Sequence, residues 1–315
     1  MFFYFLKRLG LVIPIAISVT VVCFSLVYIA PGDPLSAILP SDASIELIEK
    51  LKKDYGLDKP IPVQYVIWLG KALIGDLGTS IATGRPVSSE IGRAISNTLV
   101  LAFFGSAIGF ALGLAFGTVA GYRQGTWIDK AVTGVAVAGV SVPHYWLGMV
   151  LVIIFSVILG WLPAMGAGPA GEWAWDLEHM KHVLLPAVTI SVIPTAIVTR
   201  TVRALVADIL GREFVTALRA KGLTDWGVFL HVVKNAAPTS LAVMGVQLGY
   251  LMGGSILVET VFSWPGTGFL LNTAIFQRDI PLLQGTILVL ALFFVGLNLI
   301  VDLMQTALDP RIRRA

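Results

Sequence analysis

The chain has 315 residues, of which 56% are hydrophobic and 13% are charged, and its formal net charge is +3. A soluble globular domain carries about 25% charged residues, so this composition excludes an ordinary soluble protein and predicts an integral membrane protein. The small net charge gives no reason to expect a nucleic-acid partner, and the single cysteine, Cys23, excludes an intrachain disulfide.

Six apolar runs, taken in chain order, are each long enough to cross a hydrocarbon core of about 30 Å as a helix. The first run is longer than the core of a signal peptide and ends in a Pro-Gly turn, so we interpret it as a retained span. Pro143 interrupts the third run and Pro194 the fourth, where kinks are expected. The predicted spans are residues 9–30, 98–121, 131–159, 183–202, 238–261 and 282–307.

Two segments outside the spans are long enough to be structured. Residues 31–97 separate the first two spans, and residues 44–55 within them have the periodicity of a helix. Residues 203–237 separate the fourth and fifth spans and are predicted to form a helix–turn–helix that is broken at Gly222. Pro238 is expected to open the fifth span.

The basic residues of the short loops predict the orientation of the spans. Six spans place both termini on one side, and the positive-inside rule assigns the more basic side to the cytoplasm. Both termini and residues 203–237 are therefore expected to be cytoplasmic. The inside segments carry Lys7, Arg8, Arg123, Lys130, Arg203, Arg212, Arg219, Lys221, Lys234, Arg311, Arg313 and Arg314, whereas the short outside loops carry only Lys181 and Arg278.

Motifs for catalysis and metal binding are missing from the sequence. It contains no GxxxxGK[ST] phosphate loop, so we expect no ATPase activity by that route, and it contains no HExxH or CxxC. His179 and His182 are interpreted as solvated or interfacial residues rather than as a metal site. Ser141 and His144 flank Pro143, where they are expected to serve helix packing or the translocation pathway rather than a serine hydrolase.

The spans also lack the central charges of an ion-coupled carrier, which needs a titratable or ligating group near the membrane midplane. Glu259 lies near the outer end of the fifth span, Asp302 near the inner end of the sixth, and Arg200 near the inner end of the fourth. A selective ion channel is disfavoured as well, because no acidic ring or carbonyl filter is evident. A pathway powered from outside the chain remains.

The segment between the fourth and fifth spans could accept force from a partner. It combines a short basic helix, a glycine turn and a second helix, and its alanines would allow a partner to approach closely. The alternative is an ordinary solvated loop. The residues predicted to couple this chain to a partner are Glu213, Thr216, Ala217, Ala220, Lys221, Gly222 and Pro238.

This segment resembles the coupling motif of importer-type ABC permeases, in particular its variant in the dipeptide, oligopeptide and nickel permeases. Residues 212–238 read REFVTALRAKGLTDWGVFLHVVKNAAP. Against the general motif of the superfamily, only Ala217 and Gly222 match literally. Further pieces follow in the order of that family: IAPGDP at residues 29–34, YGLDKPIPVQY at 55–65, GDLGTS at 75–80, GGSILVETVFSWPGTG at 253–268 and ALDPRIR at 307–313.

The resemblance implies an all-α polytopic membrane protein with the type I ABC importer permease fold. Residues 1–93 would hold the first transmembrane helix and an extracytoplasmic segment, and residues 94–315 would form the importer transmembrane domain, with the coupling loop at about 203–237. Its location would be the bacterial inner membrane. The implied partners are a second homologous permease, two cytoplasmic ATPases that bind ATP and Mg²⁺, an extracytoplasmic binding protein and membrane lipid; no cofactor is implied on this chain.

Peptides are the expected cargo, with nickel, a nickel chelate or a glutathione-like compound as the alternative. A non-transporting scaffold or sensor is the rival from another functional class. Trp264 and Pro265 belong to a tight aromatic turn that is expected at the membrane interface. The residues predicted for the pathway or its outer mouth are Ser141, Pro143, His144, Glu259, Trp264, Pro265 and Gly266.

Overall fold

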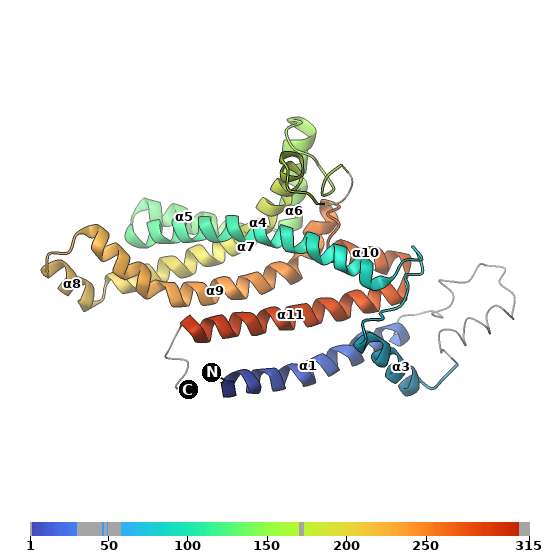
Figure 1. The fold of residues 1–315 in the computed structure, drawn as a ribbon. Helices are drawn as coiled ribbons and strands as arrows, with labels where there is room; N and C mark the ends of the chain where they lie inside the picture. Colours follow the sequence, from blue (N-terminus) through green and yellow to red (C-terminus); the bar gives the residue numbers. More distant parts are fainter. Residues whose placement is uncertain (1, 30–45, 47–48, 50–57, 170–172, 309–315) are drawn as a thin grey trace. The chain divides into compact units, whose positions relative to one another are not determined.

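A computed structural model of the chain describes residues 2–29, 46, 49, 58–169 and 173–308. These residues are mostly helical, and the β-bridge between Thr79 and Pro86 stands outside any strand (Figure 1). The chain divides into two compact units. The first comprises Met1–Ser96 and Gly266–Gly296, and the second comprises Asn97–Pro265 and Leu297–Ala315.

The first unit is built from helices that come from both ends of the sequence. They are α1 (Phe2–Ile29), α3 (Ile61–Leu73), the first turns of α4 (Val87–Tyr122), α10 (Thr267–Gln277) and the first part of α11 (Ile280–Leu308). Its buried cluster joins Val87 and Ile91 to Ala274 and Leu282. The buried carboxylate of Asp279 accepts hydrogen bonds from Ser80 Oγ and the Ala82 N–H, and also caps α11 by accepting from the Leu282 N–H at 3.1 Å.

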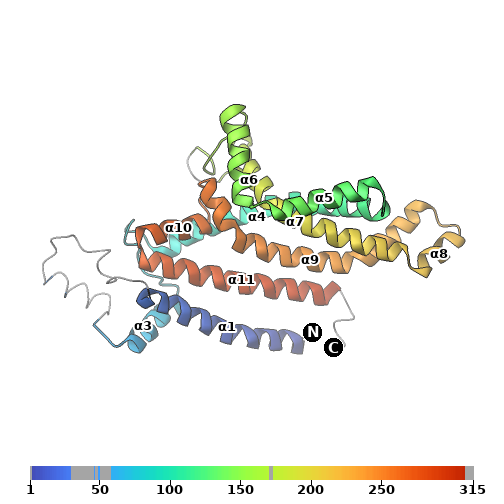
Figure 2. The same ribbon diagram turned by 180° about the vertical axis from the view of Figure 1, so that it is seen from behind.

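The second unit is organised around α7, against which α5, α6 and α9 pack (Figures 1 and 2). Of the apolar window of α7, 61% is buried inside the protein, so this helix is a core element rather than a lipid-facing one. The elements of this unit, besides the remainder of α4, are α5 (Trp127–Ser141), α6 (His144–Leu151), the π-helix η2 (Val152–Ile158), α7 (Leu177–Leu210), α8 (Glu213–Ala220) and α9 (Asp225–Val261).

A row of glycines lets α4 approach α7 closely. The glycines recur at every fourth position, so they share one face of α4. A Cβ at Gly113 would lie 2.7 Å from Val198 Cβ, and a Cβ at Gly117 would lie 2.7 Å from the Thr199 carbonyl oxygen. Small residues at such spacing allow membrane helices to pack backbone to backbone. The row consists of Gly105, Gly109, Gly113, Gly117 and Gly121.

The structure places a helix at each of the six predicted spans. Three of the described helices are long and apolar enough to cross a membrane: α4, α7 and α11 over Ile280–Val301. The number rises to five if each of two bent pairs is counted as one span. In one pair, α5 is bent by 98° relative to α6 and η2. In the other, the two parts of α9 are bent by 47°. The apolar part of α1, Ile13–Ser25, is shorter. The break between α5 and α6 falls at Pro143, as the sequence predicts.

Two expectations about the segments between the spans need correction. Pro238 does not begin a helix, because it lies inside α9, which runs without interruption from the loop into the fifth predicted span. The helix α4 begins at Val87, so the end of segment 31–97 is helical. The helices α3 and α10 were not predicted. Of the helix predicted at residues 44–55, the structure describes only Glu46 and Glu49, both in helical conformation.

Candidate functional site

The coupling segment forms a compact helical hairpin at one end of α7 and α9, which we call the α8 hairpin (residues 203–237; Figure 1). The helix α7 ends at Leu210, and the short helix α8 follows after a turn at Gly211 and Arg212. Thr224 is the N-cap of α9, and its side chain accepts a hydrogen bond from the Gly227 N–H at 3.2 Å. A capped start of this kind fixes the direction in which α9 leaves the turn.

The end of α8 is closed by a Schellman motif. The Leu223 N–H donates to the Leu218 carbonyl at 3.2 Å and the Gly222 N–H donates to the Arg219 carbonyl at 2.9 Å. Leu218 and Leu223 also pack on the same buried cluster, which is the hydrophobic contact that accompanies this motif. Gly222 has φ +81°, in the left-handed region that only glycine adopts without strain, so the predicted break at this residue is confirmed.

The α8 hairpin has its own hydrophobic core. Side chains from α7, α8 and α9 meet in one buried cluster, so the hairpin is packed against the two long helices. Because close-packed interiors are hardly compressible, a displacement of α8 is expected to displace α7 and α9 as well. The buried members are Val198, Val202, Val206, Ile209, Val215, Val228, Val232 and Ala236.

The opposite face of α8 is open. Glu213, Thr216, Ala217 and Ala220 are exposed and recur at i, i+3, i+4 and i+7, so they share one helix face. This face offers a partner two small side chains between polar ones. Lys221 and Gly222 are also exposed at its end, whereas Pro238 lies 13 residues into α9 and is half-buried.

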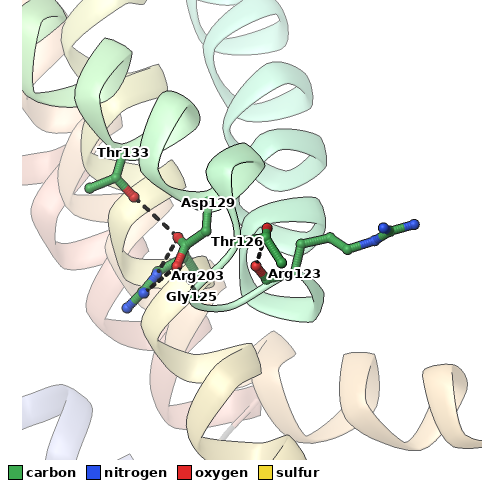
Figure 3. A network of polar contacts seen from close by, with 6 residues as sticks. All are labelled: Arg123, Gly125, Thr126, Asp129, Thr133 and Arg203. Carbon is green, nitrogen blue, oxygen red and sulfur yellow. Dashed lines mark hydrogen bonds and ion pairs between the residues drawn. The ribbon is translucent and has the colours of Figure 1, made fainter.

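An ion pair braces the base of the hairpin. Arg203 donates from Nε to Asp129 Oδ1 at 2.9 Å and from Nη2 to Asp129 Oδ2 at 2.7 Å, while the Gly125 N–H and Thr133 Oγ1 donate to the same carboxylate (Figure 3). The Asp129 side chain is 5% exposed and that of Arg203 is 31% exposed. This bidentate pair ties the turn between α4 and α5 to α7 at the point where the hairpin begins.

Asp129 was not predicted as a functional residue. Arg203 was interpreted as one of the basic residues that set the orientation and as a charge at the inner end of the fourth span. A usable signal was present, because Asp129 is a single acid between Arg123 and Lys130 at the end of a predicted span. An acid in that position needs a cation, and the nearest basic side chains of other spans would have been candidates.

The residues proposed for the outer mouth lie at the other end of α9. Thr98 Oγ1 donates to the buried Glu259 carboxylate at 2.9 Å. Trp264 Nε1 donates to the Asn97 carbonyl at 2.9 Å, and Asn97 Nδ2 donates to the Pro265 carbonyl at the same distance. These bonds fasten the turn after α9 to α4 within the second unit.

Trp264 is fully buried in the cluster around Leu101 and Leu251, with its ring centroid 5.9 Å from that of Trp173. The predicted tight turn is present, with Ser263 at φ 45°, and its indole is enclosed by protein side chains. The position of this turn at the membrane interface stays a prediction. Gly266 is the N-cap of α10 and belongs to the first unit.

The residues around Pro143 are separated by the break between α5 and α6. Ser141 is exposed and donates to the Val137 carbonyl at 2.9 Å, which occupies its hydroxyl within α5. Pro143 is the N-cap of α6 and His144 is its first residue, half-buried.

The two histidines that were predicted to lie in an outside loop have local partners. His179 Nδ1 lies 2.7 Å from Asp176 Oδ1, and His182 Nδ1 lies 3.0 Å from the Met165 carbonyl. Over the residues that the structure describes, no group of three metal-ligating side chains occurs.

Comparison with protein families covers nearly the whole chain. Residues 113–314 match the family described as "Binding-protein-dependent transport system inner membrane component". Residues 1–102 match the corresponding N-terminal family of binding-protein-dependent transport system membrane components.

Full-length relatives are found among curated proteins. The dipeptide transport system permease protein DppB of Alkalihalophilus pseudofirmus is 37% identical, over 98% of this chain and 99% of the relative. The glutathione transport system permease protein GsiC is 37% identical in Escherichia coli K12 and 39% identical in Pectobacterium atrosepticum, in each case over 98% of both chains.

Among solved structures, the fold is similar to that of the methionine ABC transporter MetNI in inward-facing conformations. The TM-score is 0.56 with 18% sequence identity, over 70% of this chain and 96% of that chain. A likeness at this identity concerns the fold alone.

Proposed function

The chain belongs to the family of binding-protein-dependent transport system inner membrane components, and from this premise we propose that it is the permease subunit of an ATP-driven importer of di- or oligopeptides. The observation that carries the proposal is the match to permeases named for dipeptide and for glutathione, a tripeptide, over 98% of the chain. Both named cargoes contain peptide bonds, so the names favour peptides over nickel. They likewise favour transport over a scaffold or sensor.

In this function the chain would form the translocation pathway together with a second permease. Two cytoplasmic ATPases would supply the energy, and an extracytoplasmic binding protein would deliver the peptide. The basic residues of the short loops support cytoplasmic termini and a cytoplasmic α8 hairpin in the inner membrane. ATP and Mg²⁺ would bind the ATPases, because this sequence has no phosphate loop.

The α8 hairpin is the part that would receive motion from an ATPase. Its exposed face offers Ala217 and Ala220 for close contact, and its buried face is continuous with the core of α7 and α9. The pair between Asp129 and Arg203 extends the same rigid assembly to α5. Displacement of α8 would therefore tilt several membrane helices together, which is what alternating access requires.

The test is transport by the reconstituted importer. The chain, its second permease, both ATPases and the binding protein are placed in liposomes, and accumulation of a labelled dipeptide, a labelled tripeptide and ⁶³Ni²⁺ is measured with and without ATP. ATP-dependent peptide uptake is expected, and the chain alone should hydrolyse no ATP. Uptake of nickel without peptide would establish the metal alternative. ATP hydrolysis stimulated by the binding protein without movement of any solute would contradict the importer function.

A further inference from the structure

The helix α3 packs on α1 with its aromatic side chains. Tyr65 Oη lies 2.8 Å from Thr20 Oγ1, and the Phe24 ring packs on those of Tyr65 and Trp68 at centroid distances of 5.4 and 5.8 Å. Figures 1 and 2 both show α3 beside the C-terminal half of α1. One face of α3 is thus occupied by a protein neighbour, and the helix contains no fully buried residue.

The face of α3 that points away from α1 is apolar. Val63, Val66 and Ile67 recur at i, i+3 and i+4, and Leu73 and Ile74 continue this stripe into the end of the helix. All five are exposed, Val66 at 66%, Leu73 at 79% and Ile74 at 83%. In a helix that lies in water this face would be polar. Here the only charge in the helix is Lys71, in its last turn.

The contacts with α1 set the depth of α3 in the membrane. Thr20 and Phe24 precede Ile29, the last residue of α1 that the structure describes, by nine and five residues. At 1.5 Å per residue the contact lies about 8–14 Å along α1 from Ile29. The stretch of α1 at this level is apolar and exposed, with Val21 at 45% and Val22 at 58%, as expected of a span surrounded by lipid.

We propose that α3 is embedded in the leaflet next to the C-terminal end of α1, with the face formed by Val63, Val66, Ile67, Leu73 and Ile74 in contact with lipid acyl chains. The occupant is assigned as lipid because this face continues the exposed apolar surface of α1 at the same depth. Tyr65 and Trp68 are covered by α1 at this depth, and Lys71, in the last turn of α3, would extend its ammonium group towards the headgroups.

The test places a fluorescent probe on single cysteines in the full importer, reconstituted in liposomes. In a Cys23→Ala background, a bimane label is attached at Val66→Cys, with Val22→Cys as the lipid-facing control at the same depth and Asp58→Cys as the aqueous control. Quenching by lipids brominated on their acyl chains is compared with quenching by iodide in the water.

The Val66 probe is expected to lose fluorescence to brominated lipid as the Val22 probe does, and to be insensitive to iodide, whereas the Asp58 probe responds to iodide. Iodide quenching at Val66 equal to that at Asp58 would place this face in water and overturn the proposal. Quenching by neither agent, with crosslinking from Val66→Cys to a second subunit or to residues 30–57, would assign the face to protein instead. The measurement requires no transport, so it stands or falls separately from the proposed cargo.

Discussion

Gly222 matters through its backbone rather than through its surroundings. A Cβ at this residue would meet no atom within 4 Å, so space does not exclude a larger side chain. The φ of +81° does, because a non-glycine residue in the left-handed region costs about 1–2 kcal/mol. The glycine thus secures the Schellman turn, and with it the angle between α8 and α9.

We predict that Gly222→Pro abolishes peptide uptake while the protein still reaches the membrane. Proline requires φ near −65° and has no N–H to donate to Arg219, so the turn cannot form. Gly222→Asp should also abolish uptake, because it adds strain and a charge at the expected contact. Uptake by cells expressing all partners is measured beside co-purification of the ATPases. Gly134→Ala, at an open position with ordinary φ, is the control and should be neutral. Normal uptake by both Gly222 variants would show that the turn is not a coupling element.

The ion pair between Asp129 and Arg203 should stabilise the protein measurably. Removing one partner leaves the other partly buried, and loss of a buried partner typically costs about 3–5 kcal/mol, so we expect about 3 kcal/mol for Asp129→Asn because Arg203 retains some solvent. The double variant Asp129→Asn with Arg203→Gln should lose less than the sum of the single variants.

The measurement is the free energy of unfolding in detergent for both single variants and the double variant. The control is the same cycle on Asp208 and Arg212, whose side chains are 62% and 58% exposed and which should couple by about 0.3–0.5 kcal/mol. Equal coupling energies for the two pairs would refute a bracing role for Asp129.

The close packing of the helix α4 on the helix α7 depends on glycines, which have no side chain to separate the two backbones. The glycine row brings the two backbones together over more than four helical turns, so α4 and α7 should move as one body. The hairpin acts in the same way at the end of α7, where its core joins α8 to the long helices.

We predict that Gly117→Ala destabilises the protein by about 1–3 kcal/mol, the usual cost of overpacking a core. Its Cβ would lie 2.7 Å from the Thr199 carbonyl oxygen, a backbone atom that cannot move without shifting α7. Gly92→Ala on the same helix is the matched control, because its Cβ meets no atom within 4 Å, and it should be neutral or slightly stabilising. Thermal unfolding of both variants in detergent would test this, and equal stabilities would contradict tight packing at Gly117.

The exposed face of α8 should tolerate only small side chains where a partner docks. Ala217→Glu and Ala220→Glu would place an unpaired carboxylate in the proposed contact, which is costly. We predict loss of uptake and of ATPase co-purification, with normal amounts of protein in the membrane. Lys221→Ala should be milder, since a charge at a rim mainly affects the association rate. If Ala217→Glu retains the ATPases and transports normally, this face is not the docking site.

For the whole molecule, we predict cytoplasmic termini and a cytoplasmic α8 hairpin. In right-side-out vesicles of a Cys23→Ala background, a membrane-impermeant maleimide should label Asp76→Cys and not Lys221→Cys. Both positions are exposed in the structure, so accessibility within the protein does not bias the comparison. Labelling at both sites, or only at Lys221→Cys, would reverse or refute the assigned orientation.

The lengths of the apolar runs and the positions of helix-breaking residues were enough to predict much of the secondary structure from the sequence alone. The six apolar runs, the break at Pro143 and the glycine turn at Gly222 were all predictable, because each depends on residues that are neighbours in the chain. The order of short motifs was likewise sufficient to indicate the permease family, which the comparisons confirm.

Only the tertiary structure decided which distant residues meet. It joined Asp129 to Arg203, buried Trp264 beside Asn97, and placed α3 against the C-terminal half of α1. Pro238 was misread for a related reason, because a proline inside a membrane helix is tolerated when neighbouring helices satisfy the freed backbone groups. Such outcomes depend on packing between segments far apart in sequence, and no local propensity encodes them.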